Sequence, residues 1–260
     1  MSQNIKELKL AVLIDADNVP YSNVKGMMEE IAKFGTPTTK RIYADWTRTN
    51  AGGWKSVLLE HAITPIQQYS YTMGKNSSDS ALIIDAMDLL YTGKVDGFCI
   101  VSSDSDFTRL AIRLRESGMK VIGIGEKKTP SSLIAACDRF IFLEVLEGAI
   151  TKKKIPKVNA TPNAKKSVEV VEKEVITKVD LQTIELIEST IEAIGDEEGW
   201  AFLGDVGNLI VKKKPEFDPR NYGFNKLTPL LKSLSDILEI DERDSEKRGI
   251  KHVYVRLRFS

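Results

Sequence analysis

The chain has 260 residues, 42% of them hydrophobic and 28% charged, a globular composition long enough for two domains. Its 37 basic and 37 acidic residues cancel, so bulk charge does not indicate a nucleic-acid-binding protein, and local patches would have to supply such binding. No apolar stretch approaches the roughly 18 residues that a membrane-spanning helix needs, and the polar start MSQNIKELKL does not resemble a signal peptide.

The first half of the chain alternates short apolar runs with amphipathic segments of helical length. Several runs are continuously apolar, as in strands that helices cover on both faces, so we expect an α/β domain with a mostly parallel sheet. The predicted strands are Lys9–Ile14, Arg41–Ala44, Thr64–Gln68, Gly97–Val101, Lys120–Ile124 and Phe140–Leu143. The predicted helices are Ser22–Phe34, Gly53–Ala62, Ser78–Tyr91, Asp106–Glu116 and Ser131–Ala136.

Acidic side chains follow two of these strands. Asp15 comes directly after the first strand, with Asp17 and Asn18 beyond it, and Asp104 and Asp106 come after the fourth. Ligands of open α/β sheets bind outside the carboxyl ends of the strands. If the two strands are neighbours, the carboxylates of Asp15 and Asp104 therefore converge at that edge.

A third acidic position lies at the start of a predicted helix. Asp79 belongs to the first turn of Ser78–Tyr91. At roughly 100° per residue, Asp88 points away from Asp79, and Asp85 lies about 120° from it. We interpret Asp85 as a residue that supports the site from behind its ligands, and Asp88 as solvated surface.

A group of unpaired carboxylates is costly, because like charges repel and resist desolvation. A divalent cation removes that cost, and Mg²⁺ or Mn²⁺ suits carboxylates, waters and a phosphate oxygen. Such an ion can activate water for attack on a phosphodiester. An aspartate after a strand is also a common turn residue or helix cap, but two such strand ends and an early-helix aspartate together favour a metal site.

The second half of the chain begins with a change of composition. The segment Thr151–Val179 is basic and polar, and we expect a flexible linker there. Helical patterns follow at Leu181–Ile194, Gly204–Val211 and Phe224–Leu234, and then alternating segments at Ile237–Asp241 and Lys251–Arg258. Helices followed by a hairpin predict a small winged-helix domain. The predicted boundaries are 1–148 for the first domain, 149–179 for the linker and 180–260 for the second domain.

The cysteines and histidines predict no metal site or disulfide. Cys99 and Cys137 lie inside apolar patterns, which favours reduced core thiols and a cytoplasmic protein. His61 and His252 lie far apart in sequence and have no Cys or His near them, so zinc is poorly supported.

Four short motifs of the first half occur together in one protein family. They are IDADNV (Ile14–Val19), KNSSD (Lys75–Asp79), SSDSDF (Ser102–Phe107), and VIGIG (Val121–Gly125) followed by CDRF. With these motifs, the region from about Leu8 to Glu144 resembles the NYN family, the PIN-like nucleases to which bacterial LabA-like proteins belong. The resemblance implies a Rossmann-like PIN fold and Mg²⁺- or Mn²⁺-dependent cleavage of RNA.

The same resemblance implies roles for individual residues. The family's metal-site carboxylates match Asp15, Asp79, Asp104 and Asp106, and its conserved asparagine matches Asn18. These five residues are therefore the expected catalytic set.

The C-terminal region resembles a LOTUS (OST-HTH) domain. The matching residues are Gly223-Phe224, Lys226-Leu227 and Leu230-Leu231. Such domains are winged helices associated with RNA or protein binding, so the resemblance implies a nuclease that carries a recognition module. The expected partner is RNA, taken to be single-stranded, with a protein partner of the C-terminal domain as the alternative; no membrane partner is expected.

Several cations are candidates for RNA contacts. Lys212–Lys214 could touch phosphates, although a solvated helix end is the simpler interpretation. A further three could line the groove of the nuclease domain: Arg48, Lys55 and Lys75.

Two other functions stay open from the residues. Asp15-Ala16-Asp17 also fits the D-x-D signature of haloacid-dehalogenase-like phosphatases, in which the first aspartate is a nucleophile and the second an acid and base. No insertion of cap-domain length follows Asp17, however, and Asn18 and Asp79 fit the nuclease better. The second alternative is a catalytically silent adaptor that binds RNA or protein.

Overall fold

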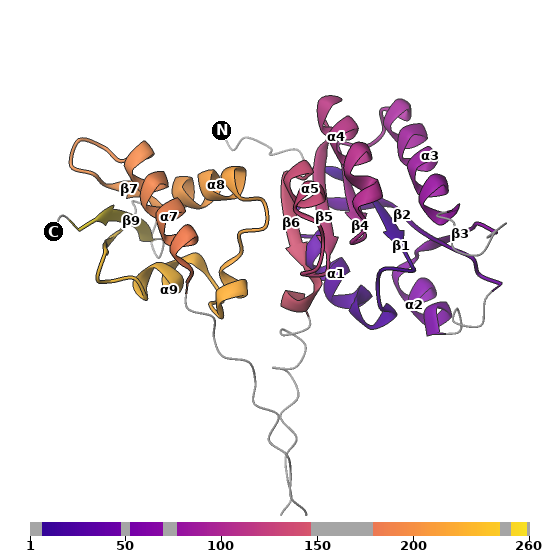
Figure 1. Ribbon diagram of the computed structural model, residues 1–260, viewed down its shortest axis with the longest axis horizontal. Coiled ribbons are helices and arrows are strands. Elements are labelled where there is room, and N and C mark those ends of the chain that lie inside the picture. Colours follow the sequence, from indigo (N-terminus) through magenta and orange to yellow (C-terminus); the bar gives the residue numbers. More distant parts are fainter. Residues whose placement is uncertain (1–6, 48–52, 70–76, 147–178, 245–250, 259–260) are drawn as a thin grey trace, which may run out of the picture. The chain divides into compact units, whose positions relative to one another are not determined.

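The computed structural model describes residues 7–47, 53–69, 77–146, 179–244 and 251–258 (Figure 1). The chain divides into two compact units. The N-terminal unit comprises Met1–Ala149 with Val211–Glu216, and the C-terminal unit comprises Ile150–Ile210 with Phe217–Ser260. Among the described helices, none is long and apolar enough to cross a membrane. The predicted linker lies outside the described residues except for Val179, so the predicted domain boundaries stay predictions.

The N-terminal unit is built on a six-stranded sheet in the order β3-β2-β1-β4-β5-β6, in which every neighbouring pair is parallel. This confirms the predicted α/β class. The strands are β1 Lys9–Asp15, β2 Thr36–Ala44, β3 Thr64–Gln67, β4 Gly97–Val101, β5 Lys120–Gly125 and β6 Arg139–Phe142. β2 begins five residues before its predicted start at Arg41, because the polar Thr36 and its successors pair with β1 from Lys9 onward.

Helices cover both faces of this sheet (Figure 1). α3, α4 and α5 pack on one face, and α1 and α2 pack on the other, so both sets of alternating strand residues are buried. This explains why the strands are continuously apolar. The helices are α1 Val24–Ile31, α2 Trp54–His61, α3 Ser77–Thr92, α4 Thr108–Glu116 and α5 Ser131–Ala136, with 3-10 turns η1 at Tyr21–Asn23 and η3 at Ser105–Phe107. Cys99 and Cys137 are buried and free, as predicted.

The strand order reverses direction between β1 and β4. From β1 the chain builds outward through β2 and β3 on one side, and it then returns to β4 on the other side. Ile14 pairs with Val101, so the carboxyl ends of the two strands lie side by side. Such a switch point is the usual place for a ligand site in a doubly wound sheet.

The C-terminal unit combines helices with a three-stranded antiparallel sheet in the order β7-β9-β8. Its elements are α7 Leu181–Ile194, β7 Ala201–Phe202, α8 Leu203–Lys213, the 3-10 turn η4 Pro219–Tyr222, α9 Leu227–Lys232, β8 Leu238–Asp244 and β9 Lys251–Leu257. Helices followed by a hairpin form the predicted winged helix. β7 was not predicted, because two residues are too few to show a pattern.

Candidate metal site of the N-terminal unit

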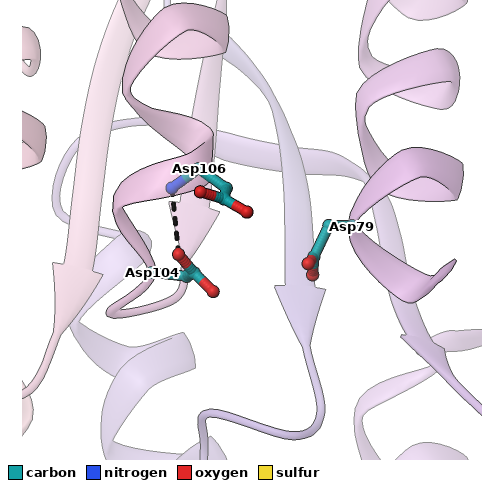
Figure 2. A group of neighbouring side chains, drawn as sticks. All are labelled: Asp79, Asp104 and Asp106. Atoms are coloured by element: carbon teal, nitrogen blue, oxygen red, sulfur yellow. Dashed lines mark hydrogen bonds between the residues drawn. The ribbon is translucent and has the colours of Figure 1, made fainter. Parts of the chain in front are cut away.

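Three carboxylates converge at the switch point. The side chains of Asp79, Asp104 and Asp106 each offer an oxygen, and these oxygens all lie within 4.8 Å of one another. Figure 2 shows Asp79 reaching from the start of α3 toward the other two, which follow β4. Asp104 caps η3 by accepting a 2.9 Å hydrogen bond from the backbone N–H of Asp106, and this bond holds the two residues together. The structure therefore brings together three of the predicted metal ligands.

Asp15 ends β1 and is almost fully buried, with 1% of its surface exposed. Its Oδ1 accepts the backbone N–H of Asp17 at 3.1 Å, and its Oδ2 accepts the side-chain amide of Asn18 and the hydroxyl of Ser102. Burial raises the pKa of Asp15, while the hydrogen bonds from Asn18 and Ser102 oppose that rise. Among the described residues, Asp15 is not part of the group within 4.8 Å, so its role as a metal ligand stays a prediction.

Ser102 is a site residue that the sequence reasoning did not select. Its hydroxyl donates to Asp15 Oδ2 at 2.9 Å and accepts the backbone N–H of Asp104 at 3.1 Å. The side chain thereby joins the ends of β1 and β4, and it is 1% exposed. The signal in the sequence was the position of Ser102. It directly follows β4, so its hydroxyl can bond to a carboxylate at the end of the neighbouring strand.

Asp79 holds its proton more tightly than an isolated aspartate does. The pKa of Asp79 rises from 3.8 to about 6, first through burial and then through the negative charges of Asp15, Asp104, Asp106 and Asp17. Ionising Asp79 without a counterion nearby is therefore unfavourable.

The donor set fits a divalent cation. All three converging side chains offer carboxylate oxygens, the ligands that Mg²⁺ and Mn²⁺ prefer. Asp79, Asp104 and Asp106 would therefore be the residues that hold such an ion.

The other acidic residues of α3 lie elsewhere. Asp85 Oδ2 accepts the Tyr43 hydroxyl at 2.8 Å and pairs with Arg41 at 2.8 Å, so it links α3 to β2. Burial and the Asp85 carboxylate raise the pKa of Tyr43. Asp88 is exposed, as predicted. The supporting role expected for Asp85 at the metal site stays a prediction.

The candidate RNA-contacting cations are partly described. Lys55 is exposed on α2, and Lys212 and Lys213 are exposed in the last turn of α8. Arg48 and Lys75 lie outside the described residues.

Solved structures that match the chain include two proteins. One is a protein of unknown function from Vibrio parahaemolyticus, 21% identical, with a TM-score of 0.46 over 53% of this chain and 94% of that one. The other is an uncharacterized protein from Nitrosomonas europaea, 28% identical, with a TM-score of 0.27 over 41% of this chain and 94% of that one. No curated protein matches the chain.

Comparison with protein families gives two matches. Residues 174–250 match the OST-HTH/LOTUS domain, which agrees with the winged-helix arrangement of the C-terminal unit. Residues 9–144 match the NYN domain, and they include the whole six-stranded sheet and the acidic group. Since that match covers more than half of the 260 residues, the chain belongs to the NYN domain family and carries an OST-HTH/LOTUS domain after it.

Proposed function

We propose that the protein is a metal-dependent ribonuclease that hydrolyses RNA phosphodiesters, with its C-terminal unit binding the RNA. The observation that carries this proposal is the convergence of Asp79, Asp104 and Asp106 at the switch point of an NYN domain, which has a nuclease-like fold. The OST-HTH/LOTUS domain supports RNA as the partner, because such domains are associated with RNA binding. A protein partner for that domain is the alternative.

Asp79, Asp104 and Asp106 would hold Mg²⁺ or Mn²⁺, with Asp15 beside them as the fourth carboxylate. When bound, the ion would supply an activated water and neutralise charge on the leaving oxygen. Asn18 and Ser102 fix the Asp15 carboxylate through hydrogen bonds to the same oxygen. Oδ1 of Asp15 accepts one backbone hydrogen bond and keeps lone-pair capacity for a ligand.

The surroundings of Asp15 favour a nuclease over a phosphatase. A covalent nucleophile has to be reached by the phosphorus atom of the substrate, and Asp15 is 1% exposed. Asp17, the acid and base of the phosphatase alternative, is exposed and donates its backbone N–H to Asp15. The intact acidic group likewise favours an enzyme over a silent adaptor.

Replacing one converging carboxylate tests the proposal. We expect Asp104→Asn to lower the rate of cleavage of labelled single-stranded RNA in Mg²⁺ or Mn²⁺ by at least about 100-fold, because it removes a charged ligand. EDTA should stop the wild-type enzyme. Asp88→Asn is the matched control, since it removes the same charge from an exposed position and should keep full activity.

The fold of Asp104→Asn has to be shown intact by circular dichroism and thermal melting. An unchanged cleavage rate would remove Asp104 from the active site. Rapid hydrolysis of small phosphomonoesters, with a phosphorylated or beryllium-fluoride-trapped Asp15, would establish the phosphatase alternative instead.

A further inference from the structure

The outward face of the sheet in the C-terminal unit has an unusual composition. Along β9, Val253, Val255 and Leu257 alternate with residues that point the other way, and Val255 is fully buried in the core. The outward positions of a sheet that faces water are usually polar. Here they carry rings and guanidinium groups, which we call the aromatic face: Trp200, Phe202, Arg243, His252, Tyr254 and Arg256.

The rings of the aromatic face contact one another across the strands. Phe202 on β7 pairs in register with Tyr254 on β9, and their ring centroids lie 5.7 Å apart. The ring of Phe202 also lies 5.6 Å from that of His252 in an edge-on arrangement. These distances are typical of favourable aromatic pairs, so the rings hold one another in place.

The two arginines lie over this ring layer. The guanidinium of Arg243 lies 4.3 Å from the ring centroid of Tyr254 and 5.5 Å from that of Trp200. The guanidinium of Arg256 lies 4.5 Å from the Trp200 ring. Asp241 and Glu239 on β8 anchor Arg243 and Arg256 at 2.7 and 2.8 Å. The guanidinium groups are therefore held by a ring on one side and a carboxylate at the edge.

Three of the planar groups are exposed over about a third of their surface or more. The Phe202 residue is 38% exposed, and the side chains of Arg243 and Arg256 are 45% and 33% exposed. A single exposed apolar residue is common on protein surfaces, but Phe202 contacts two other rings of an ordered sheet that also carries two anchored guanidinium groups. Planar, ordered groups are the surfaces on which unpaired nucleobases stack in RNA-binding proteins.

We propose that the aromatic face binds single-stranded RNA by stacking bases on Phe202 and on the guanidinium groups of Arg243 and Arg256. This assignment rests on the proposed function in taking RNA as the partner, and it names the surface that holds the RNA. Base stacking tolerates any sequence, since every base has a flat face. The aromatic face therefore retains the strand without choosing its sequence.

The charges of the face predict how this binding responds to salt. Asp241 and Glu239 already balance the charges of the two arginines. Neutralisation of RNA phosphates by these arginines should therefore contribute little to the affinity. Counterion release scales with the number of phosphates neutralised, whereas stacking releases no ions. The part of the affinity that comes from Phe202 should thus be nearly independent of salt.

The test measures binding of a fluorescently labelled, unstructured RNA to the full chain. EDTA is present to remove divalent metal, so that the RNA is not cleaved during the measurement. We expect Phe202→Leu to weaken binding roughly tenfold, because leucine keeps an apolar side chain and removes the ring that stacks. Phe202→Trp keeps a planar group and should bind at least as tightly as the wild type. Tyr91→Leu is the matched control, since it removes a ring that is 74% exposed on α3 of the other unit.

The dissociation constant of Phe202→Leu divided by that of the wild type should change by less than about twofold between 50 and 200 mM salt. Equal affinity of the two proteins, or equal losses in Phe202→Leu and Tyr91→Leu, would overturn the assignment while leaving the ribonuclease proposal intact. A loss confined to Phe202→Leu in a protein that cleaves no RNA would support the aromatic face and reject the ribonuclease.

Discussion

Among single residues, Asp79 reports most directly on the charge of the acidic group. Burial and four neighbouring carboxylates raise its pKa to about 6. In the unfolded chain the pKa returns to about 3.9, so between these values the folded state holds the proton more tightly. The free energy of unfolding of the metal-free protein therefore falls as the pH rises from about 4 to 6.

Asp79→Asn removes this loss of stability. Because Asp79 is only partly buried, solvent screening reduces the effect, and we expect the metal-free variant to be more stable than wild type by about 1 kcal/mol at pH 7.5. That difference corresponds to a melting temperature roughly 3 °C higher, and it should vanish near pH 4. Thermal melting in EDTA across this pH range measures it.

Two controls accompany the Asp79 measurement. Asp88→Asn removes a charge from the exposed side of α3 and should leave the melting temperature nearly unchanged. Adding Mg²⁺ or Mn²⁺ should reverse the order and make the wild type the more stable protein, because the ion binds the folded state only. A wild type that stays less stable than Asp79→Asn at saturating metal would argue against Asp79 as a ligand.

Among the elements, β5 contains the strand glycine with the least room for a side chain, Gly123. Gly123 faces the ring of Phe140 on β6, and a Cβ atom at Gly123 would lie 2.4 Å from the ring carbon Cδ2 and 2.8 Å from Cys137 Sγ. Phe140 is fully buried, so its ring cannot swing into solvent. Gly123→Ala should therefore cost about 1 to 3 kcal/mol of stability, measured by urea unfolding.

A double-mutant cycle separates this clash from other effects of alanine. Phe140→Leu removes the ring that the new Cβ would strike, so the cost of Gly123→Ala should shrink by at least about 0.5 kcal/mol in that background. An equal cost in both backgrounds would mean that Phe140 is not the obstacle.

For the whole molecule, the prediction concerns where the chain is first cut. From its polar and basic composition, we expect limited proteolysis to cleave first between Thr151 and Val179. The segment Ser78–Tyr91 serves as the internal comparison, because its helix buries Leu82 and Ala86 against the sheet. Mass spectrometry of the early fragments identifies the site, and initial cleavage within Ser78–Tyr91 would contradict the proposed division into two domains.

The ends of some helices and strands are set by backbone constraints, which hydrophobic periodicity does not show. The predicted helix Phe224–Leu234 is α9 at Leu227–Lys232, since Pro229 lacks an N–H and fits only the first turn. β2 is longer than predicted, because its polar start is held by pairing with β1. In both cases the apolar pattern located the element correctly, and a backbone constraint set its ends.

In the N-terminal unit, the local pattern was sufficient for the order of strands and helices, the parallel sheet and the positions of Asp15, Asp79, Asp104 and Asp106 at element ends. These properties repeat every two or every 3.6 residues, so they can be read along the chain. Only the tertiary structure placed β1 beside β4 and brought Asp79 from α3 to the aspartates after β4. It also joined Ser102 to Asp15, 87 positions apart, and paired Asp85 with Arg41. Such contacts depend on the order of strands in the sheet and on how α3 packs against it, which periodicity does not encode.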